Sequence, residues 1–384
     1  MINDFIVCVV WKVYKKLIMD KDKIFWIWLA SLEHIGNRKK IALTEYFGSA
    51  EAVFHADEKA LKEAGLKKEK ELDAILKHQD LRLAERAMAF MKKENIVFLT
   101  IEDADYPAKL KNIYNPPAVI FMKGNSELLK RKMNIAIVGS RKASSGGRKQ
   151  AESFGEALSG MGLTVISGLA EGIDSAAHTG ALRGIGSTIA VMGTGVNLCY
   201  PPKNAELYYQ IAEKGLLISE FFMDEPARTF HFPLRNRIIS GLSDGVLVVE
   251  ARKKSGALIT ADHALEQGKN VYAIPQDIRL SQSIGSNKLL KEGAKIVTDP
   301  SDVLEDYITD YSSENNQQEQ RTENKTDHLN EEEQALYKHI LNGVQTLDEL
   351  ELVTGLPVPR LNSLLMMMEL KDVIKVSYGQ ISLL

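Results

Sequence analysis

Three glycine-containing turns each follow a short apolar run and could bind phosphate groups. They are Gly139-Ser140-Arg141, residues 168–172 and residues 193–195. Glycine lets the backbone approach a ligand closely, and a serine hydroxyl beside an arginine guanidinium suits phosphate oxygens. A helix that begins after such a turn adds an anion site at its N-terminus. The turns therefore predict a site for a phosphorylated ligand.

The segment HFPLRNR, residues 231–237, combines three kinds of recognition group. Arg235 and Arg237 offer positive charge for phosphates. Asn236 offers amide hydrogen bonds for a base edge, and Phe232 offers a ring for stacking. This combination suits single-stranded nucleic acid, which proteins hold by charge along the backbone and by stacking against the bases.

Some of these charged residues have structural alternatives. Arg237 could equally form an internal ion pair with a carboxylate such as Glu220 or Glu250. Asp174 and His178 lie one helical turn apart and could suggest acid–base chemistry, but a capping aspartate and a packing histidine are the simpler interpretation. The third turn lacks the last glycine of a dinucleotide fingerprint, so it is weak evidence for NAD.

The elements that would position these turns are strands of a parallel sheet. Residues 134–138, 163–167, 187–191 and 245–250 are short runs rich in β-branched residues. Continuous apolar runs of this length are typical of strands buried on both faces. In such sheets the turns at the carboxyl ends of the strands form the ligand crevice. We therefore expect the three turns to meet at one edge of the sheet.

Positive charge concentrates around this predicted crevice, although the formal net charge of the chain is −3. The segment KKSGALITA repeats the strand–turn–helix design, with Ser255 and Gly256 capping a helix from Ala257. Local patches, rather than overall charge, decide phosphate binding. The basic residues near the turns are Arg141, Lys142, Arg148, Lys149, Lys203, Arg235, Arg237, Arg252, Lys253 and Lys254.

The composition is that of a globular protein of two or three domains. The chain has 384 residues, of which 45% are hydrophobic, and no run is long enough to span a bilayer. Cys8 and Cys199 match no metal spacing and are interpreted as reduced thiols of a cytoplasmic protein. Residues 1–18 have the wrong charge order for a secretory signal, and are either an over-extended start before Met19 or a loosely attached arm.

The chain is predicted to divide into an N-terminal extension, two domains, a linker and a small tail domain. Residues 1–21 are the uncertain extension, and residues 22–94 form a helical domain of the helix-hairpin-helix or SAM-like type. Residues 95–307 form the α/β core. The polar segment 308–330 is a flexible linker, and residues 331–384 form a winged helix.

Both flanking domains leave open what they bind. A turn at Ile35-Gly36 could grip a DNA backbone through its amides, but the same small helices serve as packing modules, which we favour. In the tail, four basic residues stand against eight acidic residues over 331–384, a net charge of −4. A recognition helix for duplex DNA should be basic or amide-rich. The tail is therefore expected to have a protein-contact or regulatory role rather than to bind duplex DNA.

The motifs of the core, in this order, resemble those of the DNA-processing protein A family (DprA, also called Smf). The matching motifs lie between residues 137 and 287, a span of 151 residues. They are IVGSR (137–141), SGLAEGIDSAAH (167–178), GTG followed by YP and Lys203 (193–203), SE (219–220), FPLRNRIISGLS (232–243), VVEARKKSGALIT (248–260) and GSN (285–287).

This resemblance implies an extended Rossmann-like fold that binds single-stranded DNA without a cofactor, a metal or catalysis. It also implies a homodimer, with residues 257–267 as a candidate pairing face, that protects the strand and loads the RecA recombinase in natural transformation or homologous recombination. In that family the positions of Arg141 and Lys203 line the DNA pocket. The predicted contacts are Gly139, Ser140, Arg141, Gly168, Lys203, Phe232, Arg235, Asn236, Arg237, Ser255 and Gly256.

A nucleotide-processing enzyme is the main alternative. Cytokinin-type phosphoribohydrolases have a similar core with a double-glycine phosphate turn, a following Gly-Thr and a catalytic glutamate. Residues 255–260 read SGALIT at the comparable place, without the double glycine or the glutamate. A binding module for a small nucleotide is a third possibility. The residues favour the non-catalytic binding protein.

Overall fold

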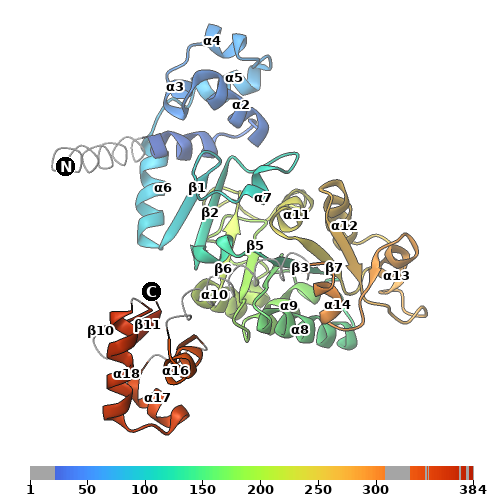
Figure 1. Cartoon of the computed structure of the whole chain (residues 1–384). Coiled ribbons are helices and arrows are strands. Elements are labelled where there is room, and N and C mark those ends of the chain that lie inside the picture. Colours follow the sequence, from blue (N-terminus) through green and yellow to red (C-terminus); the bar gives the residue numbers. More distant parts are fainter. Residues whose placement is uncertain are drawn as a thin grey trace, which may run out of the picture. The chain divides into compact units, whose positions relative to one another are not determined.

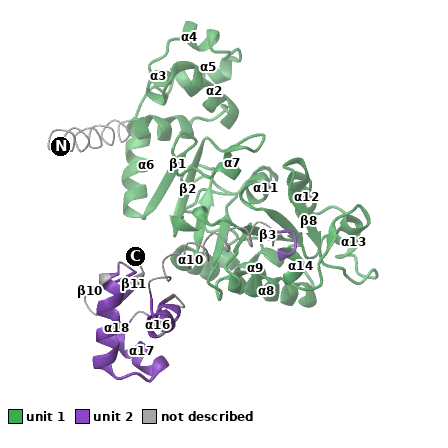
Figure 2. Cartoon of the chain, in the orientation of Figure 1, with its two compact units in different colours: residues 1–303 green, residues 304–384 purple. Residues whose placement is uncertain are grey.

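The computed structural model of the chain contains two compact units, Met1–Val303 and Leu304–Leu384 (Figure 2). Within the described ranges, every helix is too short or too polar to span a lipid bilayer. The predicted extension 1–21 and residues 308–328 of the predicted linker lie outside these ranges. The described residues are 22–307, 329–341, 344, 346–371, 373–377 and 380–383.

The first unit is built on a nine-stranded sheet of order β1-β2-β6-β5-β4-β3-β7-β8-β9. The strands from β6 to β9 in this order are parallel, as predicted, whereas β2 pairs antiparallel with both β1 and β6. The sheet is therefore mixed rather than wholly parallel. The strands are β1 Ile96–Thr100, β2 Val119–Gly124, β3 Asn134–Val138, β4 Thr164–Ser167, β5 Thr188–Val191, β6 Leu216–Ser219, β7 Gly245–Val248, β8 Asn270–Ala273 and β9 Lys295–Ile296.

The connections between the parallel strands cover both faces of the sheet. Helices α8, α9 and α10 follow β3, β4 and β5 on one face, and α11 and α12 lie on the other (Figure 1). Strand order reverses between β3 and β7, and in open sheets the crevice for a ligand lies at such a switch point. These helices are α8 Ser145–Gly160, α9 Ile173–Ala181, α10 Ala205–Lys214, α11 His231–Leu242 and α12 Gly256–Glu266.

Shorter helices complete the sequence of elements in the first unit. They follow β1, β2, β8 and β9 or precede α10 along the chain. Two of them, η1 and η2, are 3-10 helices. The remaining elements are α7 Ala108–Lys111, η1 Ser126–Lys130, η2 Pro202–Asn204, α13 Ile284–Lys291 and α14 Ser301–Leu304.

The helical N-terminal part shares one hydrophobic core with the sheet. Residues 22–31 form a helix that buries Trp26 and Trp28 in this core. Ile35 is buried, and the Asn37 side chain, at the start of α2, donates to Glu220 and accepts from the backbone of the sheet domain. The predicted hairpin turn thus packs on the core. The following helices are α2 Asn37–Phe47, α3 Ala50–Phe54, α4 Glu58–Glu63, α5 Glu69–Leu76 and α6 Arg82–Lys93.

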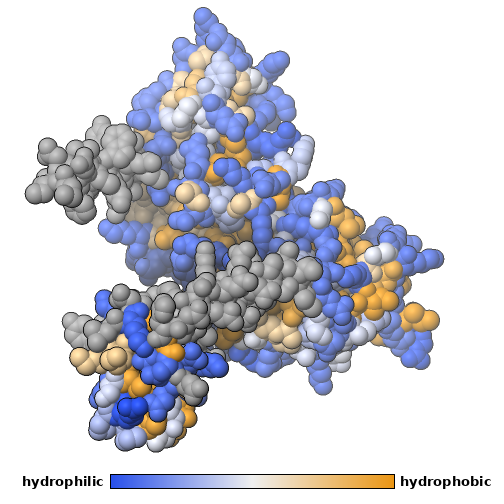
Figure 3. All heavy atoms as spheres, in the orientation of Figure 1, coloured by the Kyte–Doolittle hydropathy of each residue, from blue (hydrophilic) through white to orange (hydrophobic). Residues whose placement is uncertain are grey.

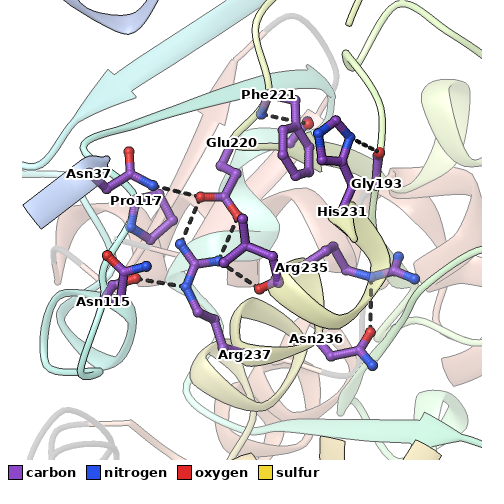
Figure 4. A network of polar contacts seen from close by, with 12 residues as sticks. Asn37, Asn115, Pro117, Gly193, Glu220, Phe221, His231, Arg235, Asn236 and Arg237 are labelled. Atoms are coloured by element: carbon purple, nitrogen blue, oxygen red, sulfur yellow. Dashed lines mark hydrogen bonds and ion pairs between the residues drawn. The ribbon is translucent and has the colours of Figure 1, made fainter. Parts of the chain in front are cut away.

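A buried ion pair joins this helical part to the sheet and to α11 (Figure 4). The Nη1 and Nη2 atoms of Arg237 lie 2.5 and 2.7 Å from the two carboxylate oxygens of Glu220, and its Nε donates to the carbonyl of Asn115 at 2.8 Å. Asn37 donates to the same carboxylate at 2.7 Å. Burial also lowers the pKa of nearby Lys40 to about 7, an effect that the Glu220 carboxylate partly opposes. Arg237 is therefore a structural arginine. The internal ion pair with Glu220 was one of the two interpretations that the sequence left open.

The second unit is a winged helix with its own core, as predicted. Thr346 and Glu349 form a capping box at the start of α17, and Leu350 and Leu361 are fully buried in the core. Strands β10 and β11 pair antiparallel as the wing. The elements are α16 Glu331–Leu341, α17 Leu347–Thr354, α18 Val358–Leu370, β10 Ile374–Ser377 and β11 Gln380–Leu383.

Replacing Arg237 by alanine should strongly destabilise the first unit. The change leaves the Glu220 carboxylate buried without its main partner, which typically costs about 3–5 kcal/mol. Urea denaturation followed by circular dichroism measures the loss. Arg183→Ala is the control, because its ion pairs with Glu152 and Glu156 are about half exposed and removing them should cost less than about 1 kcal/mol. Equal losses in the two variants would contradict the anchoring role of Arg237.

Candidate nucleic-acid interface

A pocket of about 500 Å³ opens at the switch point of the sheet, within the usual size range of ligand sites. Its walls come from the turn after β3, the first turns of α11 and the turn that leads into α12. Eight of the predicted contact residues line it. They are Gly139, Ser140, Arg141, Phe232, Arg235, Asn236, Ser255 and Gly256.

The other three predicted contact residues lie outside the lining. Lys203 is exposed at the surface, where its Nζ lies 3.2 Å from a carboxylate oxygen of Glu171. Gly168 is buried beneath Arg235, whose Nη1 donates to its carbonyl at 2.7 Å. Arg237 belongs to the buried ion pair, and Figure 4 shows its side chain and that of Arg235 on different sides of α11. The structure thus brings most, but not all, of the predicted set together.

The walls of the pocket are strongly positive. Five basic side chains line it against one carboxylate, that of Asp174. Burial raises the pKa of Asp174, while Arg235 and the N–H groups of Gly168 and Ala170 counteract this effect. Such a wall favours anions. The five are Arg141, Lys142, Arg235, Arg252 and Lys254.

Arg235 forms the floor of the pocket and Asn236 connects two helices beside it, and internal hydrogen bonds hold both side chains in place. The Arg235 guanidinium donates to the carbonyls of Gly168 and Val191, and its Nε donates to the Asn236 amide oxygen. Burial lowers the pKa of Arg235 to about 10, so the group remains charged at neutral pH. The Asn236 amide nitrogen donates to the carbonyl of Gly256 at 3.1 Å. Asn236 thus ties α11 to α12, with both polar atoms of its amide engaged inside the protein.

Two aromatic rings and a guanidinium form a stack at the mouth of the pocket. The Arg141 guanidinium lies 5.0 Å from the centroid of the Phe232 ring, a cation–π contact. The Tyr200 ring lies 5.5 Å from Phe232 at an interplanar angle of 33°. A β-carbon on Gly193 would lie 2.9 Å from the Phe232 ring, so only glycine fits there. Tyr200 was not among the predicted contacts, although its position directly before the Pro-Pro-Lys segment was an available signal.

The helix N-termini around the pocket play unequal roles. Ser144 caps α8, and the buried Glu250 carboxylate accepts from both the backbone N–H and the hydroxyl of Ser144. An internal carboxylate therefore occupies the anion site that was expected after the first turn. At α12 the cap Ser255 and the exposed Gly256 line the pocket, so this N-terminus remains open to a ligand.

His178 is a structural residue. It is fully buried, and burial lowers its pKa to about 3, so the imidazole is neutral at physiological pH. Its Nε2 accepts from the backbone N–H of Leu169, which leaves Nδ1 to donate to the Thr188 hydroxyl at 2.7 Å. The packing interpretation of His178 fits this geometry.

Comparison with known proteins identifies the family of this fold and pocket. The family model described as DNA recombination-mediator protein A matches residues 97–308. This chain belongs to that family. A second model, the DprA winged helix domain, matches residues 320–380.

Relatives in the DNA recombination-mediator protein A family cover much of the chain. DNA processing protein DprA of Streptococcus pneumoniae is 46% identical over 208 residues, which are 54% of this chain and 73% of the relative. Protein Smf of Escherichia coli is 40% identical over 253 residues, 62% of this chain and 67% of Smf. The X-ray structure of the S. pneumoniae protein superposes with a TM-score of 0.64 and 36% identity, covering 73% of this chain and 96% of that one.

A second solved relative bears on the ligand. The DNA processing protein A of Helicobacter pylori superposes with a TM-score of 0.51 and 28% identity, covering 56% of this chain and 96% of that one. The study of that protein concerns its single-stranded DNA binding mode.

Replacing Gly168 by alanine should disturb the floor of the pocket. The new β-carbon would lie 2.4–2.6 Å from the guanidinium of Arg235, which must then leave its carbonyl partners. We expect a loss of about 1–3 kcal/mol in stability, typical of overpacking. Gly160→Ala is the control, because its β-carbon would meet nothing within 4 Å at the end of α8. Thermal melting of both variants measures the difference, and equal melting temperatures would contradict the close fit.

Proposed function

We propose that this protein binds single-stranded DNA in the pocket between β3 and β7, without modifying it. The observation that carries the proposal is the convergence of five basic side chains and a Phe232–Tyr200 ring pair on one pocket. Charge and stacking faces together are the requirements of an unpaired strand. The single-stranded DNA binding mode of the H. pylori relative supports the same ligand.

In this proposal phosphates are held by the cationic wall and bases by the rings. Arg141 and Lys142 contact phosphates from one side, and Arg252, Lys254 and the N-terminus of α12 contact them from the other. Stacking on an aromatic ring is tolerant of sequence, so base specificity should be low. Lys203 is proposed as a contact at the rim, where a phosphate would replace Glu171 as its partner.

The polar groups of the pocket support binding rather than catalysis. Among the described residues that line it, Asp174 is the single carboxylate, and no histidine or cysteine is included. Asp174 is buried and accepts from backbone N–H groups, so it is engaged as a structural acceptor. Nucleotide hydrolysis usually needs a general base placed to activate a water molecule or a side-chain nucleophile. This lining therefore supports the binding proposal over the enzyme alternative.

The proposal extends to assembly and to a partner. We infer a cytoplasmic homodimer that protects single-stranded DNA and loads RecA on it, in transformation or recombination. Apolar side chains gather over α12 and α13, a candidate pairing surface (Figure 3). Two copies would place two pockets on one strand and raise avidity. The exposed apolar residues there are Ile259, Leu265, Ile278, Leu280 and Ile284.

Arg141→Ala should weaken binding of single-stranded oligonucleotides and reduce its salt dependence. Loss of one phosphate contact should lower the slope of log K against log salt by about 0.7. Loss of its stacking on Phe232 adds to the effect, so we expect at least about a tenfold rise in Kd at low salt. Fluorescence anisotropy over a salt series provides the measurement, with Arg183→Ala as the control. Unchanged affinity and slope in Arg141→Ala would remove this residue from the interface.

RecA loading should depend on the same pocket. On single-stranded DNA precoated with a single-strand-binding protein, the wild-type protein should shorten the lag before RecA begins to hydrolyse ATP. At a protein concentration below its raised Kd, Arg141→Ala should leave the lag close to that of RecA alone, because little of the variant is bound to the strand. If the wild-type protein binds the oligonucleotide but leaves the lag unchanged, the RecA part of the proposal fails while strand binding stands.

A further inference from the structure

A second cation–aromatic pair lies on the first unit outside the pocket. The Arg38 guanidinium lies 4.7 Å from the centroid of the Tyr114 ring, and its Nη1 donates to the Tyr114 hydroxyl at 2.7 Å. The Tyr114 side chain is nevertheless 83% exposed. A large ring is thus held in one orientation by a guanidinium while most of its surface faces solvent. Such a ring is a ready stacking surface.

The backbones on both sides of this pair are anchored. Asn37, directly before Arg38, donates to Glu220 and accepts from the N–H of Ala118. Asn115, directly after Tyr114, accepts through its carbonyl from the Nε of Arg237 at 2.8 Å. The pair is therefore preorganised at the junction of the helical part and the sheet. Preorganisation lowers the entropy that a ligand must overcome on binding.

The first turns of α11 lead from the pocket to this pair. Phe232 and Pro233 line the pocket at the start of α11, and Arg237 lies one helical turn later, on the side of the helix away from Arg235 (Figure 4). The Arg237 Nη1 donates to the carbonyl of Leu234, and its Nε reaches Asn115. Phe230, the N-cap residue of α11, and Leu234, four positions later, are 61% and 37% exposed. Leu234, three positions before Arg237, lies on the same side of α11 as Arg237, whose Nε contacts the residue after Tyr114.

The same device occurs in the pocket itself. There the Arg141 guanidinium lies 5.0 Å from the Phe232 centroid, with Tyr200 alongside. A guanidinium stacked on a ring supplies positive charge for a phosphate and leaves an aromatic face for a base, the two contacts that an unpaired strand offers at each nucleotide. Two such pairs on one compact unit, one in the pocket and one beside the segment that Arg237 of α11 contacts, suit one continuous strand.

We propose that Arg38 and Tyr114 form an outlying platform on which a base of the bound strand stacks after the strand leaves the pocket across α11. The platform rests on the proposed function of the pocket and lengthens its footprint toward the helical part. Its ligand is the same unpaired nucleic acid, recognised without base specificity. A short strand that fills only the pocket does not reach the platform, whereas a longer strand contacts both.

The test compares a short and a long oligothymidine, of about 5 and about 20 nucleotides, by fluorescence anisotropy. Tyr114→Ala should raise the Kd of the long strand about fivefold or more and leave the short strand within twofold. Tyr114→Phe keeps the ring and should bind both strands as the wild type does. Arg38→Ala should weaken binding of the long strand and lower the slope of log K against log salt for that strand by about 0.7.

Tyr209→Ala is the matched control, because this tyrosine is 65% exposed on α10 and packs edge-on against Tyr208 rather than under a cation. It should bind both strands as the wild type does. An unchanged Kd of the long strand in Tyr114→Ala overturns the platform, while Arg141→Ala still weakens both strands if the pocket is correct. If Arg141→Ala changes neither strand, the pocket proposal fails instead. Melting temperatures near that of the wild type confirm that each variant is folded.

Discussion

The buried ion pair between Arg237 and Glu220 is the constraint on which the arrangement of the pocket depends. Taking both charges out of water is costly, and the cost is offset only where the remaining donors and acceptors are also satisfied. Here they are, through Asn37 and the carbonyls of Asn115 and Leu234. Because the pair and its partners come from four separate segments, they hold the helical part, the β1–β2 connection, the end of β6 and α11 in one geometry.

Helix geometry converts that constraint into a pocket. Arg235 and Arg237 are two positions apart, so their side chains leave α11 about 200° apart. With Arg237 fixed toward Glu220, Arg235 must face the ends of β4 and β5, where it meets the carbonyls of Gly168 and Val191. Phe232 then lies against Gly193, at the mouth of the pocket. One segment of the chain thus provides both an anchor and a floor, although its two arginines look alike in sequence.

Much of the sheet could be predicted because buried parallel strands are marked by their own composition. The runs 134–138, 163–167, 187–191 and 245–250 agree with β3, β4, β5 and β7 to within two residues at each end. The three turns were expected at one edge for the same reason. The antiparallel strands β1 and β2 were not predicted, since pairing at the edge of a sheet depends on the sheet that is already formed.

Side-chain direction was the part that could not be predicted. A guanidinium binds a carboxylate as well as a phosphate, so nothing in the residue type separated the role of Arg237 from that of Arg141. Glu250 presents the reverse case: the N-terminus of α8 does bind an anion, but the anion is a side chain from the segment just after the neighbouring strand β7. The partner of each side chain depends on contacts between segments that are distant in the sequence. A local sequence pattern carries no information about those contacts.

The positive charge of the pocket wall depends on which groups the nearby carboxylates bind. Near the pocket, the carboxylates of Glu220, Glu250 and Asp174 all accept hydrogen bonds from donors inside the protein. Asp174 is the single carboxylate among the lining residues, so it alone offsets the positive charge there. The lining cations apart from Arg235 are Arg141, Lys142, Arg252 and Lys254. In the winged helix the opposite holds.

There Arg360 pairs with Glu332, and Lys371 pairs with the buried Glu333. Two of its four cations are thus tied to its own acids in a domain of net charge −4. A fold that commonly reads duplex DNA here has little charge to offer a phosphate backbone, which fits the expectation of a protein contact. An overall charge of −3 is therefore compatible with a strand-binding pocket, because the cations and the anions serve different parts of the chain.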